Sequence, residues 1–576
     1  MNFSFFLSNN TLFLQDKPYK MRVAAIYIPE GTIPHIFGKG HEEMTINLGG
    51  KSIYTVSGGQ INFVKPNTYF IDDIFSKDIS LLSAVVGSNG GGKSTLLRLL
   101  TSSKYDCSYV LEYEKKDPEL VDFLQGFHRV YYTPYLNNFS FNSMESNEKD
   151  LSKLGLLKSD NHGDSDSLMH FLEAHESENM KRWIKFNHFF KQHPNNKVRL
   201  PTFNRLTLSL RHFDLTVFKP NEFHNTAYQL RNVITLILEK IQQESKQKEI
   251  DALEGQDTHD DSTGAYFPIR FIYDLYELAL AKLVSIFEGT GNRYLNEGII
   301  HEDYKDQLAN LDVHNSMIWF LRNGGVYLGQ NKYSFAEHII LIELIDYIVS
   351  LLDVERITDN WREIEISEAE ALQIIELYDR FNESFINEWF KFDTEPMFSF
   401  RPHVTVSSGE QSYFDLFSTL YYHAGNIKAG IDIDEYNSNS LKYIKEDILL
   451  LLDEGDNAFH PQWKKEYVKY LRDILPTIFP DYKIQVVIIS HDPLTLSDLP
   501  KNNVVYLEKS DGITRLGKSE QKRTLGANIS DLLKDSFFLE DGQIGGFIAV
   551  VIDKVINDIR NRQLLPKRKE DHTCDR

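Results

Sequence analysis

A glycine-rich run near residue 90 has the composition of a phosphate-binding loop. Its residues are Gly87, Ser88, Asn89, Gly90, Gly91, Gly92, Lys93, Ser94 and Thr95, and they fit the pattern G-x-x-x-x-G-K-[ST] without deviation. Glycines let successive backbone N–H groups point at phosphate oxygens, and the start of a following helix adds positive charge. Lys93 would contact the β- and γ-phosphates, while the Ser94 hydroxyl suits Mg²⁺. The run predicts a site for ATP and Mg²⁺.

Two carboxylates follow an apolar run much later in the chain. Ile448–Leu452 is continuous in Ile and Leu, as expected of a strand buried on both faces, and Asp453 and Glu454 come directly after it. Asp453 can hold Mg²⁺, directly or through water. Glu454 is then placed to orient and polarise the water that attacks the γ-phosphate. With the glycine-rich run, this pair predicts hydrolysis rather than passive nucleotide binding.

Two further polar segments accompany these motifs. Ser407, Ser408, Gly409 and Glu410 precede an amphipathic run about 40 residues before the acidic pair. Hydroxyl groups, glycine N–H groups and a helix start together suit an anion. His491 follows the next apolar run, Gln485–Ile489, at the place where a strand would end. Residues 455–461 lie between the acidic pair and this second run.

These four motifs together resemble the ATP-binding cassette (ABC) family, in the form found in SMC-like and RecF-like ATPases. The resemblance implies that residues 407–410 contact the γ-phosphate held by a second copy of the chain, and that His491 is the switch histidine. It also implies an interface role for residues 455–461. Such proteins usually carry a glutamine loop after the first lobe. The segment Arg129–Asn138 contains no glutamine, and Gln125 is only a weak candidate, so that role stays unassigned.

The predicted fold class is α/β: an ABC-type P-loop ATPase head, with a mixed sheet and flanking helices, that is split by a large insertion. Residues 1–135 form the first part of the head and 401–510 the second. The insertion at 136–400 is expected to be mainly helical, and 511–576 a helical C-terminal segment. Ser367 and Glu370 predict a capping box. The polar stretches Glu145–Glu178 and Glu244–Gly264 are expected to be loops or connectors, and no heptad pattern persists.

Composition narrows the class of protein further. The 576 residues carry a formal net charge of −21, which disfavours broad nonspecific coating of DNA. The basic run Lys567–Lys569 is interpreted as a solvated end. Two cysteines, Cys107 and Cys574, are too few for a disulfide framework and favour the reducing cytoplasm. Neither a secretory signal nor a membrane-spanning segment is expected.

The strings LLLLDEGDNAFHPQWKKEYVKYL, ISHDPLTLSDLP and TLGANISDLLKDSFFLEDG resemble bacterial anti-phage ATPases of the overcoming-lysogenization-defect and PtuA kind. More than 300 residues separate Lys93 from Ser407, far more than in transporter ATPases. The resemblance to the PtuA family of Septu and some retron systems implies a head-to-head homodimer, or a higher oligomer, that works with a separate PtuB-like HNH nuclease. Nucleic acid, as DNA, RNA or retron msDNA, is a further expected component.

Two other functions stay open at this point. One is a DNA-maintenance ATPase of the RecF or SMC type that binds DNA directly. The other is a self-contained RloC-like tRNA nuclease with its activity in the insertion. No H-N-H constellation, zinc-spaced Cys/His set or Cys–His pair is evident in the sequence, and the residues after His491 are too few for a Toprim domain and a helical tail. An intrinsic nuclease is therefore not expected.

Overall fold

The structure of the chain is a computed structural model. It describes residues 20–101, 106–124, 126–136, 148–160, 168–193, 202–211, 228–254, 266–288, 298–328, 330–385, 396–429, 447–517, 523–536 and 546–564. Three residues or runs considered above, Gln125, Lys567–Lys569 and Cys574, lie outside these ranges. Cys107 is buried and free.

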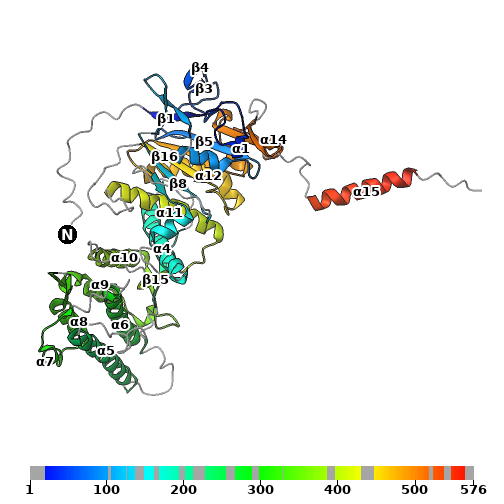
Figure 1. The fold of residues 1–576 in the computed structure, drawn as a ribbon. Coiled ribbons are helices and arrows are strands. Elements are labelled where there is room, and N and C mark those ends of the chain that lie inside the picture. Colours follow the sequence, from blue (N-terminus) through cyan, green and yellow to red (C-terminus); the bar gives the residue numbers. More distant parts are fainter. Residues whose placement is uncertain are drawn as a thin grey trace, which may run out of the picture.

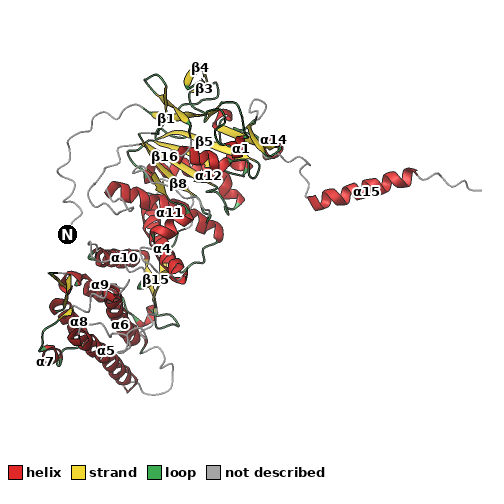
Figure 2. Ribbon diagram, viewed as in Figure 1, coloured by secondary structure: helices red, strands yellow, loops and turns green. Residues whose placement is uncertain are grey.

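A seven-stranded, largely parallel sheet forms the centre of the α/β part (Figures 1 and 2). Its order is β19-β18-β5-β17-β16-β8-β9, and only the pairing of β18 with β19 is antiparallel. The strands are β5 (Ile79–Gly87), β8 (Phe127–Tyr132), β9 (Glu148–Asp150), β16 (Asp447–Asp453), β17 (Ile484–Ile489), β18 (Val504–Ser510) and β19 (Ile513–Leu516). Strands from both ends of the chain are therefore neighbours. This architecture is compatible with a P-loop ATPase.

Alternate residues of the central strands enter two separate cores. On one face, Val85 and Leu451 pack with the leucines of α2 (Lys93–Thr101) and with the four-stranded antiparallel sheet β2-β1-β6-β7. On the other face, Val86 and Leu452 pack with α11 (Ser408–Ala429) and α12 (Pro461–Ile478). Burial on both faces explains why these strands are continuous apolar runs. The flanking elements are β1 (Met21–Ile28), α1 (Pro34–Phe37), β2 (Met44–Asn47), β6 (Ser108–Tyr113), β7 (Glu119–Val121) and the hairpin of β3 (Ser52–Ser57) with β4 (Gln60–Pro66).

The register of the sheet brings three strand ends level. Ile489 of β17 pairs with Val85 of β5 on one side and with Asp453 of β16 on the other. All three strands run in parallel, so the loops that leave their carboxyl ends emerge at one edge. This register positions the glycine-rich run, the acidic pair and His491 together.

Apart from β9, which joins the central sheet, the segment between β8 and α11 folds into helices and two small antiparallel sheets, β14-β10-β15 and β11-β12-β13. Figure 1 shows its helices beneath the central sheet, where α4 packs on α11. The elements are α3 (Lys153–Ser159), α4 (Leu168–Gln192), β10 (Arg205–Leu210), α5 (Tyr228–Glu254), α6 (Phe267–Glu288), β11 (Gly298–Ile299), α7 (Tyr304–Leu308), α8 (Val313–Asn323), β12 (Gly325–Leu328), β13 (Asn331–Ser334), α9 (Ile340–Ser350), β14 (Glu363–Ser367), α10 (Glu368–Glu383) and β15 (Phe398–Pro402).

Two expectations about this segment need correction. Glu145–Glu178 is not only a connector, because it contains β9, α3 and the first half of α4. Within Glu244–Gly264, the helix α5 continues to Glu254. The end of α5 is largely exposed, whereas the first stretch contains buried polar residues, among them Glu148, His175 and Ser177, so its polar composition did not indicate a solvated chain. The capping box is confirmed: the Ser367 hydroxyl accepts from Glu370 N, and the Glu370 carboxylate accepts from Ser367 N at 2.7 Å.

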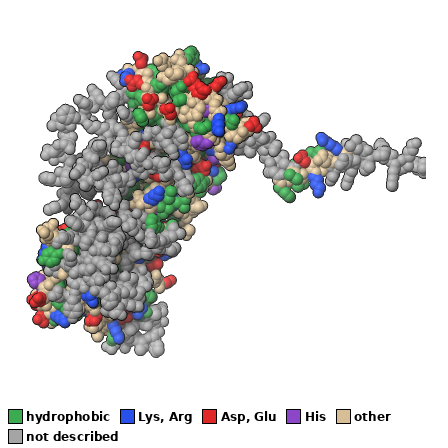
Figure 3. All heavy atoms as spheres, in the orientation of Figure 1, with side chains coloured by type: hydrophobic (Ala, Val, Ile, Leu, Met, Phe, Trp, Pro, Cys, Tyr) green, Lys and Arg blue, Asp and Glu red, His purple; other side chains and the backbone are tan. Residues whose placement is uncertain are grey.

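The C-terminal elements are α13 (Pro493–Leu496), α14 (Ile529–Ser536) and α15 (Gly546–Leu564). Figure 1 shows α15 apart from the rest of the described chain, and large apolar side chains such as Phe547 and Val550 are exposed on it. Among the helices that the structure describes, none combines the length and apolar character needed to cross a bilayer. On the face in Figure 3, acidic and basic side chains are interspersed over the described residues, and Lys and Arg do not gather there into one broad patch.

Candidate functional site

The glycine-rich run forms the turn between β5 and α2, as its motif predicts. Gly90 has φ +70° and Gly92 has φ +83°, a left-handed conformation that glycine adopts without strain. A Cβ atom at Gly92 would lie 2.7 Å from Cγ2 of Ile36, so the loop is also packed too closely for a side chain there. Leu96 N donates to Gly92 O at 2.9 Å, which starts the helical hydrogen bonding directly behind the loop. The backbone thus curls tightly into the N-terminus of α2.

Two side chains of the loop fit a phosphate ligand. Lys93 is buried, and its Nζ donates to the carbonyl oxygens of Gly87 at 3.0 Å and Ser88 at 3.1 Å, which holds the ammonium group across the loop. Burial lowers the pKa of Lys93, while the charges of Glu454 and Asp453 act in the opposite direction. Ser88 Oγ is buried and has no hydrogen-bond partner within the described part of the chain. A buried cation and an unpaired hydroxyl are the groups that phosphate oxygens satisfy.

Asp453 ends β16 and faces the start of α2. Its carboxylate accepts a hydrogen bond from Tyr131 Oη at 3.0 Å and is hydrogen-bonded to the Ser94 side chain. Burial raises the pKa of Asp453, and these two hydrogen bonds partly offset that effect. A buried carboxylate beside a serine hydroxyl is an oxygen donor pair suited to Mg²⁺.

Glu454 leaves the strand in a conformation that few non-glycine residues adopt, with φ +55°. Its N–H donates to Ile489 O at 3.0 Å, so the neighbouring strand fixes the turn. Nε2 of His491 lies 3.3 Å from Oε1 of Glu454. This contact with His491 is the largest of the effects that lower the pKa of Glu454. Glu454 is therefore an ionised acceptor held next to an imidazole.

The segment after Glu454 is also fixed by polar contacts. Asp456 is buried, and its Oδ2 accepts from Ser490 Oγ at 2.6 Å and from Thr495 Oγ1 at 3.1 Å. Burial raises the pKa of this carboxyl group. Ala458 follows with φ +62°. These bonds connect the loops after β16 and β17 into one unit.

The serine-rich motif caps α11. Glu410 Oε2 accepts from Ser407 N at 2.7 Å and Ser407 Oγ accepts from Glu410 N at 3.4 Å, a reciprocal capping arrangement. Ser407 and Ser408 are exposed, whereas Gly409 is buried. A Cβ atom at Gly409 would lie 3.1 Å from Ala458 O. The motif therefore rests on the segment after the acidic pair and points its serines to the surface.

The predicted residues therefore fall into two groups. Residues 87–95, Asp453, Glu454 and His491 meet at the carboxyl edge of the central sheet. No hydrogen bond or ion pair between described residues joins Ser407–Glu410 to that group. Two tyrosines were missed by the sequence analysis: Tyr131, which contacts Asp453, and Tyr135, which contacts Glu454. Both lie within Arg129–Asn138, the segment in which a glutamine was expected. Their position in that segment, and not their residue type, was the signal that could have identified them.

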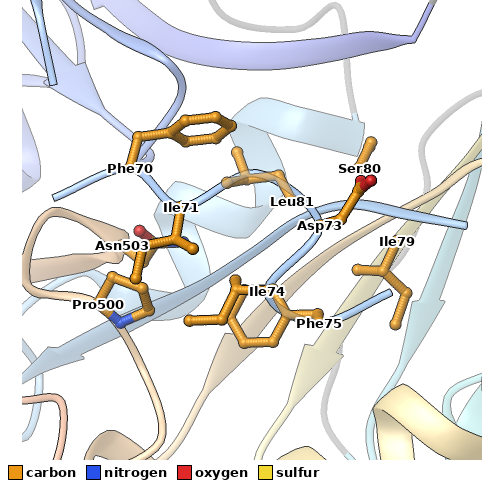
Figure 4. A pocket seen from close by; sticks show the side chains of 10 residues that line it. All are labelled: Phe70, Ile71, Asp73, Ile74, Phe75, Ile79, Ser80, Leu81, Pro500 and Asn503. Atoms are coloured by element: carbon orange, nitrogen blue, oxygen red, sulfur yellow. The ribbon is translucent and has the colours of Figure 1, made fainter. Parts of the chain in front are cut away.

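A small pocket lies away from this edge (Figure 4). It is lined by Phe70, Ile71, Asp73, Ile74, Phe75, Ile79, Ser80, Leu81, Pro500 and Asn503. Ile79–Leu81 form the amino end of β5, the opposite end from Gly87. The pocket is not part of the candidate site.

Part of the chain is similar to a known protein. Over 158 residues, it is 25% identical to Septu protein PtuA of Bacillus thuringiensis. The chain is distantly related to this Septu protein. The aligned part is 26% of this chain and covers 38% of the relative, little more than a third of its length. No protein-family model matches the chain.

Proposed function

We propose that this chain is the ATP-hydrolysing subunit of an anti-phage defence system, with an ABC-type head. The observation that carries the proposal is the meeting of Lys93, Asp453, Glu454 and His491 at the ends of three adjacent parallel strands. Buried cation, buried carboxylate, ionised acceptor and imidazole are the groups that phosphoryl transfer to water requires. The distant similarity to Septu protein PtuA supports the defence context.

In this proposal ATP lies on the glycine loop. The N–H groups of residues 88–93 and the Lys93 ammonium bind its phosphates, and Ser94 and Asp453 hold Mg²⁺. The ion supplies charge neutralisation for the transferring phosphoryl group. Glu454 accepts the proton of the attacking water. His491 orients the Glu454 carboxylate and faces the γ-phosphate.

In this proposal residues 407–410 act on a second copy of the chain. Ser407 and Ser408 are exposed at the start of α11, where hydroxyl and N–H groups can meet an anion bound by a partner protomer. ATP then favours the closed homodimer, because only that state adds these contacts to its phosphates. Closure and reopening would move the segment between β8 and α11 and regulate a separate nuclease subunit of the HNH, PtuB-like kind, with nucleic acid as a further component.

The test is nucleotide binding, hydrolysis and assembly in the purified full chain. Lys93→Ala should abolish ATP binding, measured by calorimetry, whereas the exposed Lys332→Ala should not. Glu454→Gln should keep ATP binding and lower phosphate release by roughly 10²–10⁴-fold. The matched control is Glu355→Gln, since that side chain is exposed within the inserted segment.

Assembly is measured by sedimentation of the Glu454→Gln protein with and without ATP. A dimer that forms only with ATP, and that Ser407→Arg prevents, is the expected result. A Glu454→Gln protein that binds ATP and stays monomeric at micromolar concentration would overturn the dimeric scheme. Copurification of a nuclease with the tagged chain tests the proposed partner. If the purified material hydrolyses ATP but has no associated nuclease activity, that result would count against a nuclease partner.

A further inference from the structure

Tyr135 lies three residues beyond the end of β8, and β8 is a direct neighbour of β16 in the sheet. Tyr132, the last residue of β8, pairs with Leu452, so the chain leaves β8 beside the point where Asp453 and Glu454 leave β16. The strands are parallel, and the two exit loops therefore share the edge that holds the candidate site. The position of Tyr135 at this edge is therefore set by the register of the sheet and not by the sequence around it.

The hydroxyl group of Tyr135 bridges both ends of the turn that begins at Glu454. Nδ2 of Asn457 donates to Tyr135 Oη, and the side chain of Tyr135 is hydrogen-bonded to that of Glu454. The turn itself is closed by Asn457 N, which donates to Glu454 O at 3.0 Å. A phenol has one donor and can accept, so it donates to the carboxylate while it accepts from the amide.

Tyr135 is 42% exposed, so the residue is not held by core packing. Its hydrogen bonds are therefore the contacts that tie it to the site. Burial of the hydroxyl and the negative charge of Glu454 raise the pKa of Tyr135 to about 12, which keeps the hydroxyl protonated as a donor at neutral pH.

We propose that Tyr135 is a positioning residue for hydrolysis, whose hydroxyl holds the Glu454 carboxylate and the Asn457 amide in the orientation that Glu454 needs to accept a proton from water. This rests on the proposed ATPase function. Glu454 has a φ of +55°, and the contacts that orient its carboxylate come from side chains that follow the two neighbouring strands. Tyr135 and His491 approach it from β8 and β17, the strands on the two sides of β16.

The test is Tyr135→Phe in the full chain, which removes the hydroxyl and keeps the ring. A hydrogen bond to a charged group contributes enough to predict a fall in kcat of roughly 10- to 100-fold. KM for ATP and the ATP dissociation constant should change less than about twofold, because the phosphate loop is untouched. The thermal midpoint should be unchanged.

Tyr113→Phe is the matched control. Tyr113 Oη donates to Glu119 at 2.9 Å on the four-stranded sheet, and the pKa of Tyr113 is likewise raised to about 12. This variant removes the same kind of hydroxyl–carboxylate bond away from the site and should hydrolyse ATP at the wild-type rate. In the Glu454→Gln background, Tyr135→Phe should have no further effect on hydrolysis, as expected for two residues that act together.

If the wild-type chain hydrolyses ATP and Tyr135→Phe has the same kcat, this inference is overturned and the proposed function is not. A loss that appears only as a higher KM would also overturn it, since it would place Tyr135 in nucleotide binding. A wild-type chain that fails to hydrolyse ATP would overturn both the inference and the proposed function.

Discussion

Nε2 of His491 lies 3.3 Å from Oε1 of Glu454, and the two residues follow adjacent parallel strands that are more than 30 residues apart in the chain. Both side chains are partly exposed, at 39% and 31%. The pair can therefore reach a ligand and still hold each other in place. In the proposed reaction, the imidazole keeps the carboxylate of Glu454 ionised and directed at the water.

His491→Ala should slow ATP hydrolysis and leave ATP binding intact. The variant removes one of the side-chain contacts that orient Glu454, and a misdirected base is expected to lower kcat by roughly 10-fold or more. Steady-state phosphate release and calorimetric binding of ATP measure the two effects. The exposed His301→Ala, in the inserted segment, is the control. Unchanged kcat in His491→Ala would remove His491 from the proposed mechanism.

Gly409→Val should impair dimerisation and hydrolysis without loss of ATP binding. A Cβ atom at Gly409 would already lie 3.1 Å from Ala458 O, and Ala458 has a left-handed conformation with φ +62°. A branched side chain must displace either the start of α11 or the turn after the acidic pair. The matched control is Gly425→Val, because Gly425 lies on the same helix with open space around its Cβ position. If both variants retain ATP-dependent dimerisation, the exact placement of residues 407–410 is not required.

The sequence predicted the parts of the site whose chemistry is contained in contiguous residues. The loop at 87–95 and the pair Asp453–Glu454 are each recognisable from the residue types in one short contiguous segment. Each follows an apolar run, so its place at the end of a strand could be inferred. Tyr131 and Tyr135 could not, because only the pairing of β8 with β16 brings them to Asp453 and Glu454, more than 300 residues later. Their sequence context gives no sign of that pairing.

The connector expected at Glu145–Glu178 shows the same limit for the fold. Its acidic composition predicts a solvated chain, yet α4 starts at Leu168 and continues to Gln192. The apolar contacts that stabilise this helix come from its later residues: Trp183 stacks on Phe414 at 5.1 Å, and Phe186 lies against Phe417 of α11. A composition window that ends at Glu178 excludes those residues, and α11 lies more than 200 positions further on.

The buried histidines His128 and His423 should make the folded state sensitive to mild acid. Their Nε2 atoms are 2.9 Å apart, and burial lowers the pKa of His128 to about 4 and that of His423 below its usual value. The unfolded chain binds these protons near pH 6.5, so stability is complete above that pH and falls as pH decreases toward 4. Each histidine contributes at most about 1.4 kcal/mol per pH unit.

His128→Gln should therefore reduce the pH dependence of stability, since it keeps a polar partner for His423 and removes one titrating group. Urea unfolding at pH 7.5, 6.0 and 5.0 measures it, and the exposed His301→Gln is the control. A slope equal to that of the wild type would show that this pair does not control acid sensitivity.

Asp160→Asn should destabilise the folded chain strongly. Arg182 donates to both carboxylate oxygens of Asp160 at 2.8 Å, and His175 Nδ1 lies 2.7 Å from Oδ2. All three side chains are almost fully buried. Burial alone would raise the pKa of Asp160, but the charge and hydrogen bonds of Arg182, with His175, lower it to about 2. An asparagine leaves the guanidinium group buried without its counter-charge, which costs about 3–5 kcal/mol.

The sign of the pH effect follows from that lowered pKa. The ionised Asp160 contributes its stability above the unfolded pKa of an aspartate, near 3.9, and loses it as pH falls through about 2. The difference in unfolding free energy between wild type and Asp160→Asn should therefore be constant from pH 8 to 5 and shrink only below about pH 4. Glu343→Gln is the control: Glu343 pairs with Arg380 at 4.0 Å, both side chains are more than half exposed, and its loss should cost under about 1 kcal/mol. Equal stability of the two variants at pH 7 would contradict the assignment of Asp160 as the buried anion that holds α3 against α4.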